Sequence, residues 1–387
     1  MKLDNNQKAF LALLREGLWA DVGITGSGNQ GFTEPIDWQE VYRLAEEQSV
    51  IGLVAAGLEK AEGGRLKAER KYGLTQEMML TFVGKSLQIE QYNLAMNKFI
   101  AELVQELRVA DIYTLIVKGQ GIAQCYERPL WRTSGDVDFY MSEDDFEKAK
   151  IFFRPLVGKF DPDNDYTRHI NMHYGSWVVE IHANQYCSLS SRINNVLDEI
   201  HENLFKKGDV RSWENGHTTI YLPSPNNDVL IIFTHFLKHF YNGGIGLRQI
   251  CDWCRLLWRY RAELDSRLLE SRIKKMGLLN VWKAFAAFAV EYLGMPVEAM
   301  PFFSDKKRWK EKARRITGLI FETGNFGHNR DISYYVKYPY VIKKIISFWR
   351  HTWDSIRQFF IFPVDSTRVW GFMISEGVLE LQKNRKL

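Results

Sequence analysis

The chain has 387 residues, which at roughly 150 residues per domain is enough for two or three domains. Apolar residues make up 45% of it and charged residues 25%, an ordinary balance that excludes collagen-like, disordered and membrane-spanning classes. The net charge of +4 is unevenly distributed, because residues 301–387 contain 17 Lys and Arg and 8 Asp and Glu. Such a basic region can bind nucleic acid, an anionic membrane surface or the acidic side of its own protein.

Residues 1–110 are expected to form an N-terminal helical region. Asp37 and Glu40 have the spacing of a capping box ahead of the apolar Val41. A long periodic pattern over residues 75–109 predicts a single helix.

The pattern changes over residues 111–222, where short β-rich runs alternate with helices. Strands are predicted at residues 112–117, 137–141, 166–174 and 177–183, the last two as a hairpin. A short helix is expected at 121–127, and Ser142 is expected to cap a helix that ends near residue 153. This region therefore predicts an α/β unit with a mixed sheet.

Residues 223–387 return to a helical pattern, with Ser224 as the first cap. Charged residues interrupt the apolar stretch near the C-terminus: Lys343, Lys344, Arg350, Asp354 and Arg357. Because no window holds 18 uncharged apolar residues, we expect no transmembrane segment. The predicted fold class is α+β, with a small mixed-sheet domain flanked by N-terminal and C-terminal helical regions.

The cysteines and the first residues bear on the cellular compartment. The cysteines are Cys125, Cys187, Cys251 and Cys254. They are too few and too scattered for a disulfide framework, which favours a reducing compartment. The first residues lack a long apolar run followed by small residues, so we expect no signal peptide and a cytoplasmic protein. Cys251 and Cys254 fall inside a helical pattern without a second cysteine pair, which favours packing over a zinc or redox role.

Two aspartates, Asp136 and Asp138, alternate with Val137 and Phe139. On a strand, alternate side chains share a face, so both carboxylates project from one side while the apolar residues point into the core. Like charges this close repel unless a cation lies between them, which makes the pair a candidate Mg²⁺ site at a phosphate-handling centre. An exposed acidic strand end is the alternative, because Asp-x-Asp is a common tripeptide.

The neighbouring segments favour the metal interpretation. A turn follows the strand predicted to end at residue 117 and comprises Lys118, Gly119, Gln120 and Gly121. Its backbone N–H groups, at the start of a short helix, can hold a phosphate. Downstream, Glu180 shares a strand face with His182 and can join the aspartates as a third carboxylate. Three acidic groups on adjacent strands can hold the paired metal ions used in in-line phosphoryl displacement.

Three segments together resemble a known family: residues 115–123, 132–140 and 179–182, with the sequences LIVKGQGIA, RTSGDVDFY and VEIH. They are similar to the nucleotidyltransferase-like family of bacteria, which belongs to the polymerase-β-like nucleotidyltransferase superfamily. Members typically pair a Lys-Gly turn with an arginine, a Gly-Asp-x-Asp strand and a later Glu-x-His strand. The resemblance covers roughly residues 35–300, and it implies that residues 111–222 form a minimal nucleotidyltransferase domain.

The resemblance also implies roles for individual residues. Asp136 and Asp138 are expected to bind Mg²⁺, with two ions possible, and Glu180 to be the third metal ligand or the general base. The nucleotide-binding set comprises Lys118, Gly119, Gln120, Gly121, Arg132, Ser134 and Gly135. Lys118 and Arg132 are expected to neutralise triphosphate oxygens, the lysine as a point charge and the arginine as a fork. Structural pairing with an aspartate is the alternative for each.

Further polar residues are weaker candidates for contact with an acceptor or for support of the site: His182, His235, His239, Arg248 and Asp252. His182 can orient the third carboxylate, contact the acceptor, or serve only the structure of its strand. His235 and His239 share a helix face, as metal ligands would, but no glutamate follows the first histidine, so helix packing is favoured. His169 and His173 share a strand face that can point to the site or to solvent.

Together these features predict a Mg²⁺-dependent nucleotidyltransferase that uses a nucleoside triphosphate. An acceptor would attack the α-phosphate and pyrophosphate would leave; the acceptor can be a small molecule, a protein or an RNA. The turn has Gly119-Gln120 where the superfamily has Gly-Ser or Gly-Gly, so a catalytically idle nucleotide- or partner-binding protein is one alternative. An RNA-binding module that uses the basic C-terminal third is another.

Overall fold

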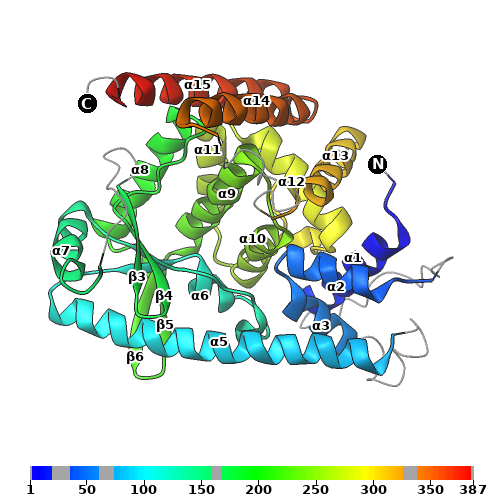
Figure 1. The fold of residues 1–387 in the computed structure, drawn as a ribbon, viewed down its shortest axis with the longest axis horizontal. Helices are drawn as coiled ribbons and strands as arrows, with labels where there is room; N and C mark the ends of the chain where they lie inside the picture. Colours follow the sequence, from blue (N-terminus) through cyan, green and yellow to red (C-terminus); the bar gives the residue numbers. More distant parts are fainter. Residues whose placement is uncertain (1, 20–34, 61–73, 159–167, 326–337, 385–387) are drawn as a thin grey trace.

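The computed structural model describes residues 2–19, 35–60, 74–158, 168–325 and 338–384. The fold is α+β (Figure 1). The 34-residue helix α5 (Gln76–Val109) runs along one side of the molecule, and α14 (Tyr340–Phe359) and α15 (Pro363–Asn384) lie along the opposite side. Within the described residues, every strand lies between Leu115 and Pro223, so the sheet structure is confined to the middle of the chain.

The remaining α-helices of the described residues precede this middle part, lie within it or follow it. They are α1 (Asn5–Leu18), α2 (Trp38–Glu47), α3 (Ile51–Lys60), α6 (Gly119–Ala123), α7 (Glu143–Phe153), α8 (Ser191–Phe205), α9 (Pro225–Asn242), α10 (Leu247–Arg259), α11 (Ser266–Met276), α12 (Leu279–Leu293) and α13 (Lys307–Thr323). Among the helices of the described ranges, none is long and apolar enough to span a membrane.

The main sheet has four strands in the order β1-β2-β4-β3. They are β1 (Leu115–Val117), β2 (Val137–Tyr140), β3 (His169–Tyr174) and β4 (Trp177–His182). β2 runs parallel to β4, whereas β1 and β3 are antiparallel to their neighbours, so the sheet is mixed, as predicted. β3 and β4 form the predicted hairpin; the first two residues of that prediction, 166 and 167, lie outside the described residues.

The two faces of this sheet carry different side chains, as alternation along a strand requires. On one face, Phe139 and Ile181 are fully buried in a core to which α5 and α7 also contribute. On the other face, Asp138 and Glu180 lie opposite each other in the parallel pairing of β2 and β4. This polar face borders a cavity whose far side is formed by α9 and α10.

The predicted helix starts at residues 37, 75 and 142 are confirmed, whereas Ser224 precedes α9 without a capping hydrogen bond from its side chain. The Thr75 hydroxyl accepts a hydrogen bond from the backbone N–H of Met78 at the start of α5, and the Ser142 hydroxyl accepts one from that of Asp145 at the start of α7. The side chain of Asp37 caps α2 in the same way. These caps satisfy N–H groups that a helix start otherwise leaves without a partner.

β1 is shorter than predicted, because Ile112 closes the preceding helix instead of opening the strand. Asp111 has a left-handed φ of 55°, and the N–H of Ile112 donates to the carbonyl of Leu107 at 2.9 Å. This is the pattern of a Schellman motif, in which an apolar residue follows the left-handed position. The short helix predicted at 121–127 also differs, since α6 begins directly after the Lys118 turn and a tight turn ends it at Ala123.

A second, two-stranded sheet was not predicted. Its strands β5 (Val210–Asn215) and β6 (Thr218–Pro223) pair antiparallel. Gly216, the first residue of the connecting turn, has φ of +63°, the left-handed conformation that a tight hairpin turn requires. Ile220 and Leu222 of β6 extend the core beneath the buried face of the main sheet.

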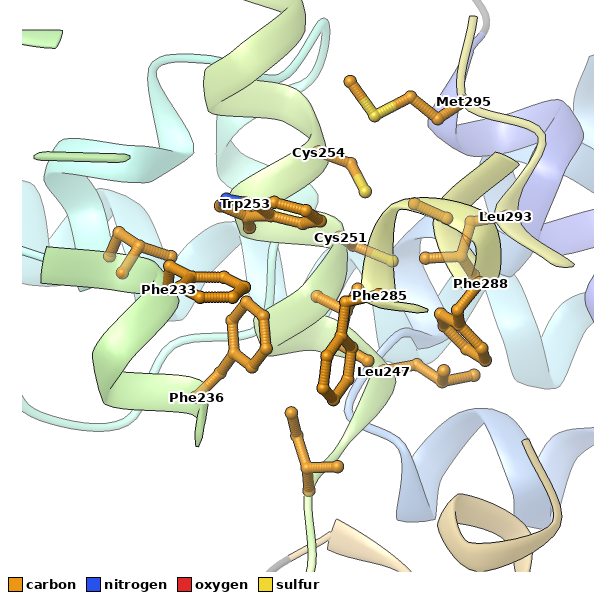
Figure 2. Close-up of a cluster of buried hydrophobic side chains, with 14 of the residues drawn as sticks. Phe233, Phe236, Leu247, Cys251, Trp253, Cys254, Phe285, Phe288, Leu293 and Met295 are labelled. Atoms are coloured by element: carbon orange, nitrogen blue, oxygen red, sulfur yellow. The ribbon is translucent and has the colours of Figure 1, made fainter. Parts of the chain in front are cut away.

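A cluster of buried apolar side chains joins α9, α10 and α12 (Figure 2). Phe236 packs against Phe285 with ring centroids 5.0 Å apart, and Trp253 lies 5.7 Å from Phe236. Cys251 and Cys254 lie in this cluster, and both are buried and free. Burial raises the pKa of both thiols and keeps them protonated. The cysteines therefore contribute packing, as favoured from the sequence, and the cluster fixes two helices that border the cavity.

Candidate active site

Three carboxylates meet at the polar face of the main sheet. Asp136 precedes β2, Asp138 lies within it, and Glu180 lies opposite Asp138 in β4. Oxygens from the three side chains all lie within 4.8 Å of one another. The in-register parallel pairing accounts for this convergence, because it places Asp138 and Glu180 on the same side of the sheet. Carboxylate oxygens are the ligands that suit a hard divalent cation such as Mg²⁺.

The electrostatic surroundings of the three carboxylates differ. Burial, together with the negative charges of Asp138 and Glu180, raises the pKa of Asp136. Burial also opposes ionisation of Asp138, but the charge of Lys118 and a hydrogen bond from His182 outweigh it and lower the pKa of that carboxyl. For Glu180, burial is likewise outweighed, by hydrogen bonds from two histidines, and its pKa is lowered. Asp136 is therefore the carboxylate whose repulsion a bound cation relieves most.

Lys118 supplies a positive charge inside this group. Its Nζ lies 2.8 Å from Asp138 Oδ1, and both side chains are largely buried. The backbone of Lys118 has φ of +57°, a conformation that costs a non-glycine residue about 1 to 3 kcal/mol. Gly119 follows with φ of +37° and lines the cavity. The strained turn therefore holds the ammonium group on the carboxylate, which is the pairing considered as an alternative from the sequence.

Arg132 is held by the helical part of the chain. Its guanidinium binds Asp252 of α10 as a fork, with Nε–Oδ1 and Nη2–Oδ2 distances of 2.7 Å. The hydroxyl of Tyr126 donates to the same carboxylate at 2.7 Å. Arg132 and Asp252 are each only 5% exposed. This buried fork fixes the segment that carries the aspartates against α10.

The polar side chains of the turn lie beneath the cavity. Gln120 is buried, and its amide donates to Asn93 Oδ1 at 2.7 Å and to Ser134 Oγ at 3.2 Å. Gly121 packs against a leucine of β6, whose Cδ2 lies 2.8 Å from the position that a Cβ atom would take. Gln120, Gly121 and Ser134 are thus placed where they support the turn from the side of α5, and they do not line the cavity.

The cavity has a volume of about 360 Å³ and lies between the sheet and two helices. On the sheet side it is lined by Gly119, Gly135 and the three carboxylates. On the helical side it is lined by side chains of α9 and α10, namely His235, Lys238, His239, Arg248, Gln249 and Asp252. The sheet wall is therefore acidic, and the helical wall carries basic side chains.

Two cations of the helical wall have no carboxylate partner. Within the described residues, Lys238 makes no ion pair and no hydrogen bond, and burial lowers its pKa. Arg248 donates from Nη1 to the carbonyl of Thr133 at 2.9 Å, while its Nε is buried without a partner. Burial also lowers the pKa of Arg248. Asp252 and Asp136 act on Arg248, and Glu180 acts on Lys238, without forming an ion pair among the described residues. Both buried cations can therefore gain from a bound anion, which makes this wall suited to an anionic ligand.

The two histidines of α9 interact with each other. Their Nε2 atoms lie 3.1 Å apart, and both side chains line the cavity. Burial, aided by Lys118, lowers the pKa of His239 to about 3 and that of His235 well below its usual value. Both imidazoles are therefore neutral at neutral pH. Within the described residues, neither belongs to a group of three potential metal ligands.

Some cavity residues were not expected from the sequence. Lys238 lies three residues after His235 on α9, and this helical spacing was a usable signal that both side chains share a face. Asn184 and Gln185 line the cavity from the loop that follows β4. No sequence pattern marks these two residues, because a loop has no periodicity that fixes a face.

Basic residues of the C-terminal part make contacts within the protein. On α13, Lys310 pairs with Glu291 at 3.3 Å. Lys312 and Arg315, from the same helix, donate to backbone carbonyls of the segment that joins α14 to α15. Part of the C-terminal positive charge is thus used to hold helices together, which is one of the three roles considered for it.

Comparison with known proteins identifies a family. No curated protein and no solved structure matches the chain significantly. One family model, described as an uncharacterised nucleotidyltransferase, matches residues 34–294. This span contains both walls of the cavity, from the turn at Lys118 to Asp252. The chain therefore belongs to this nucleotidyltransferase family.

Proposed function

We propose that the protein is a Mg²⁺-dependent nucleotidyltransferase that moves a nucleoside monophosphate from a nucleoside triphosphate to an acceptor. The observation that carries this proposal is the separation of charge within one cavity. Three carboxylates converge on the sheet wall, and Lys238 and Arg248 lie on the helical wall without a carboxylate partner in the described residues. A metal–triphosphate complex has the matching division, with a cation at one side and phosphate oxygens at the other.

Asp136, Asp138 and Glu180 would hold the metal. Their oxygens are hard ligands, and the raised pKa of Asp136 reflects burial together with repulsion from the other two carboxylates. When bound, Mg²⁺ would polarise the α-phosphate and stabilise the negative charge that develops there, as a single ion or as one of a pair. The lowered pKa of Glu180 makes this residue a weak base, which favours a role as metal ligand over general base.

The helical wall would bind the triphosphate. Lys238 contributes a point charge, and Arg248 contributes a guanidinium whose Nε has no partner among the residues that the structure describes. Lys118 can turn its charge toward phosphate once a metal neutralises Asp138. Arg132 keeps its fork on the α10 carboxylate and acts as a positioning residue for the segment that leads into β2.

The proposed reaction is a displacement at the α-phosphate. An acceptor oxygen forms a bond to this phosphorus and loses its proton, while the bond to the bridging oxygen breaks and pyrophosphate leaves. The acceptor can be a small molecule, a protein or an RNA. The cavity volume of about 360 Å³ lies within the range of about 300 to 1,000 Å³ that is usual for small-molecule sites.

Binding and transfer can be tested together. Nucleoside triphosphates labelled at the α-phosphate are bound with and without Mg²⁺, then incubated with the protein and a cell extract that supplies acceptors. We expect Mg²⁺-dependent binding and label in an acceptor, whose size identifies its class. The exposed Asp144→Asn variant serves as a matched control. Nucleotide binding without transfer would support a catalytically idle nucleotide-binding protein. If the protein instead retains RNA from the extract and binds no nucleotide, the RNA-binding alternative would be supported.

We also propose that this activity is cytoplasmic. The four cysteines of the chain are all buried and free, which is compatible with a reducing compartment. Cell fractionation with detection of the chain tests the location. Recovery of the protein in an exported fraction would contradict the proposal.

A further inference from the structure

A second group of potential metal ligands lies beside the three carboxylates. In the antiparallel pairing of β3 and β4, His169 is opposite His182 and Asn171 is opposite Glu180. Residues directly opposite each other in such a pair point to the same face of the sheet. The four side chains therefore form a square of two imidazoles, one carboxylate and one amide on the polar face.

The two imidazoles lie next to the same carboxylate oxygen of Glu180. His169 Nε2 lies 3.1 Å from Glu180 Oε2, and His182 Nε2 lies 3.3 Å from the same oxygen. The two rings are stacked, with centroids 4.4 Å apart and planes inclined by 10°. One ligand atom from each of these three residues lies within 4.8 Å of the other two. Two imidazole nitrogens and a carboxylate oxygen thus converge. Without metal each Nε2–H donates to a carboxylate; with the ring proton on Nδ1, the same two nitrogens can bind a transition metal.

A separate observation supports a missing ligand at this place. Among the described residues, the buried side-chain oxygen of Asn171 has no hydrogen-bond partner. Buried carbonyl oxygens are satisfied in nearly all proteins, so this oxygen is expected to accept from a water or an ion. Asn171 lies directly across from Glu180, the carboxylate that both histidines contact.

We propose that His169, Glu180 and His182 form a binding site for a divalent transition-metal cation of the Mn²⁺, Co²⁺ and Zn²⁺ class. Imidazole nitrogen favours such cations over Mg²⁺, which prefers oxygen ligands and keeps its water. Glu180 has two oxygens and is shared between this group and the aspartates, and His182 Nε2 also lies 3.0 Å from Asp138 Oδ1. The two metal sites are therefore adjacent but differ in their ligands.

The test uses Mn²⁺ as the probe and the full chain after removal of metals by a chelator, with no nucleotide present. Loss of the free Mn²⁺ signal in electron paramagnetic resonance gives the affinity and the number of ions. Electron spin-echo envelope modulation detects coupling of bound Mn²⁺ to imidazole nitrogen. We expect nitrogen coupling in the wild type, and we expect excess Mg²⁺ to leave it in place.

Variants separate a ligand from a structural histidine. His169→Ala and His182→Ala should each weaken the nitrogen-coupled Mn²⁺ by about tenfold or more. His169→Gln can still donate a hydrogen bond to Glu180, so a purely structural role predicts Mn²⁺ binding like that of the wild type. A ligand role predicts weaker binding and a shallower nitrogen modulation, because only His182 remains as an imidazole ligand. His173 is exposed on the same strand, and His173→Ala is the matched control that should bind Mn²⁺ like the wild type. Circular dichroism checks that each variant is folded.

The outcomes distinguish this site from the proposed function. The site is overturned if Mn²⁺ fails to bind or binds without nitrogen coupling. It is also overturned if His169→Gln binds Mn²⁺ with the affinity and the nitrogen modulation depth of the wild type. Mg²⁺-supported transfer can still occur in that case, since it depends on the aspartates. A nitrogen-coupled ion in a chain that transfers no nucleotide would instead contradict the proposed function alone.

Discussion

The two walls of the cavity are stabilised differently before any ligand binds. On the sheet wall, Asp138 is paired with Lys118 and hydrogen-bonded by His182, and Glu180 is held by histidine. On the helical wall, Lys238 and Arg248 have no carboxylate partner among the described residues. A metal must therefore compete with a resident cation on the sheet wall, whereas an anion at the helical wall meets two cations that form no ion pair among the described residues. This difference predicts that anion binding depends most on the helices and metal binding on the strands.

The largest effect is expected from Asp136→Asn on the sheet wall. The variant removes an anionic metal ligand, so Mg²⁺-dependent transfer should fall by about a thousandfold. The same change removes repulsion between this carboxylate and its two neighbours, so metal-free stability should be unchanged or higher. Steady-state kinetics and thermal unfolding without metal measure the two quantities. A large loss of metal-free stability would show that the carboxylate is a structural partner, and the catalytic interpretation would fail.

Asp252→Ala tests the buried ion pair with Arg132 that connects the two walls of the cavity. This change leaves the buried charge of Arg132 and the hydroxyl of Tyr126 without their partner. The free energy of unfolding should fall by about 3 to 5 kcal/mol, as for other broken buried pairs. Urea unfolding measures this change in the free energy of unfolding. Glu202→Ala, which breaks the exposed pair with Lys206, is the control and should cost less than about 1 kcal/mol. Equal losses in the two variants would mean that the fork does not hold the walls together.

The charge of the helical wall is tested by Lys238→Met. Binding of the nucleoside triphosphate should weaken about tenfold, or about 1.4 kcal/mol, while Mg²⁺ affinity in the absence of nucleotide stays the same. Stability should not fall, because the lysine has no ion pair or hydrogen bond to lose among the described residues. Calorimetric titration with nucleotide and with metal separates the two affinities. Lys307→Met, at an exposed position on α13, is the control. Loss of metal affinity in Lys238→Met would contradict the assignment of separate roles to the two walls.

The sheet wall could be predicted from the sequence because a strand has a period of two. Alternation fixed the shared face of Asp136 and Asp138, and the same rule placed Glu180 on the polar side of its strand. The caps of α2 and α7 were likewise predictable, since they depend on residues only three apart.

The helical wall could not be predicted in the same way. Arg132 meets a carboxylate 120 residues later in the chain, and such a pairing is set by packing rather than by any local pattern. Ile112 was assigned to a strand because it is apolar and β-branched, although its position after a left-handed residue makes it a helix end. The β5–β6 hairpin was missed although its two-residue turn begins with Gly216, and glycine at the first turn position is a hairpin signal.

The smallest effect is a pH dependence of stability that comes from the helical wall. His239 has a pKa lowered to about 3 by burial and by nearby positive charges, so it stays neutral in the folded protein. The unfolded chain takes up a proton near pH 6.5, the ordinary value for histidine. The stability due to the neutral imidazole is therefore complete above pH 6.5 and is lost as the pH falls toward 3. The charged or titratable groups that act on this imidazole include His235, whose Nε2 lies 3.1 Å away, together with Lys118, Lys238, Arg248 and Asp138.

His239→Gln isolates this contribution, because other groups titrate in the same range. The pKa of the buried Asp228 is raised to about 6, so its protonation stabilises the folded state as the pH falls and opposes the histidine. The carboxyls whose pKa is lowered, such as Glu180, lose stability only below their ordinary value of about 4.5. Between pH 7 and 5.5, urea unfolding should show that the wild type loses about 1 kcal/mol more than His239→Gln. Equal slopes in the two proteins would mean that the imidazole is protonated in the fold, and the helical wall would then carry a third cation.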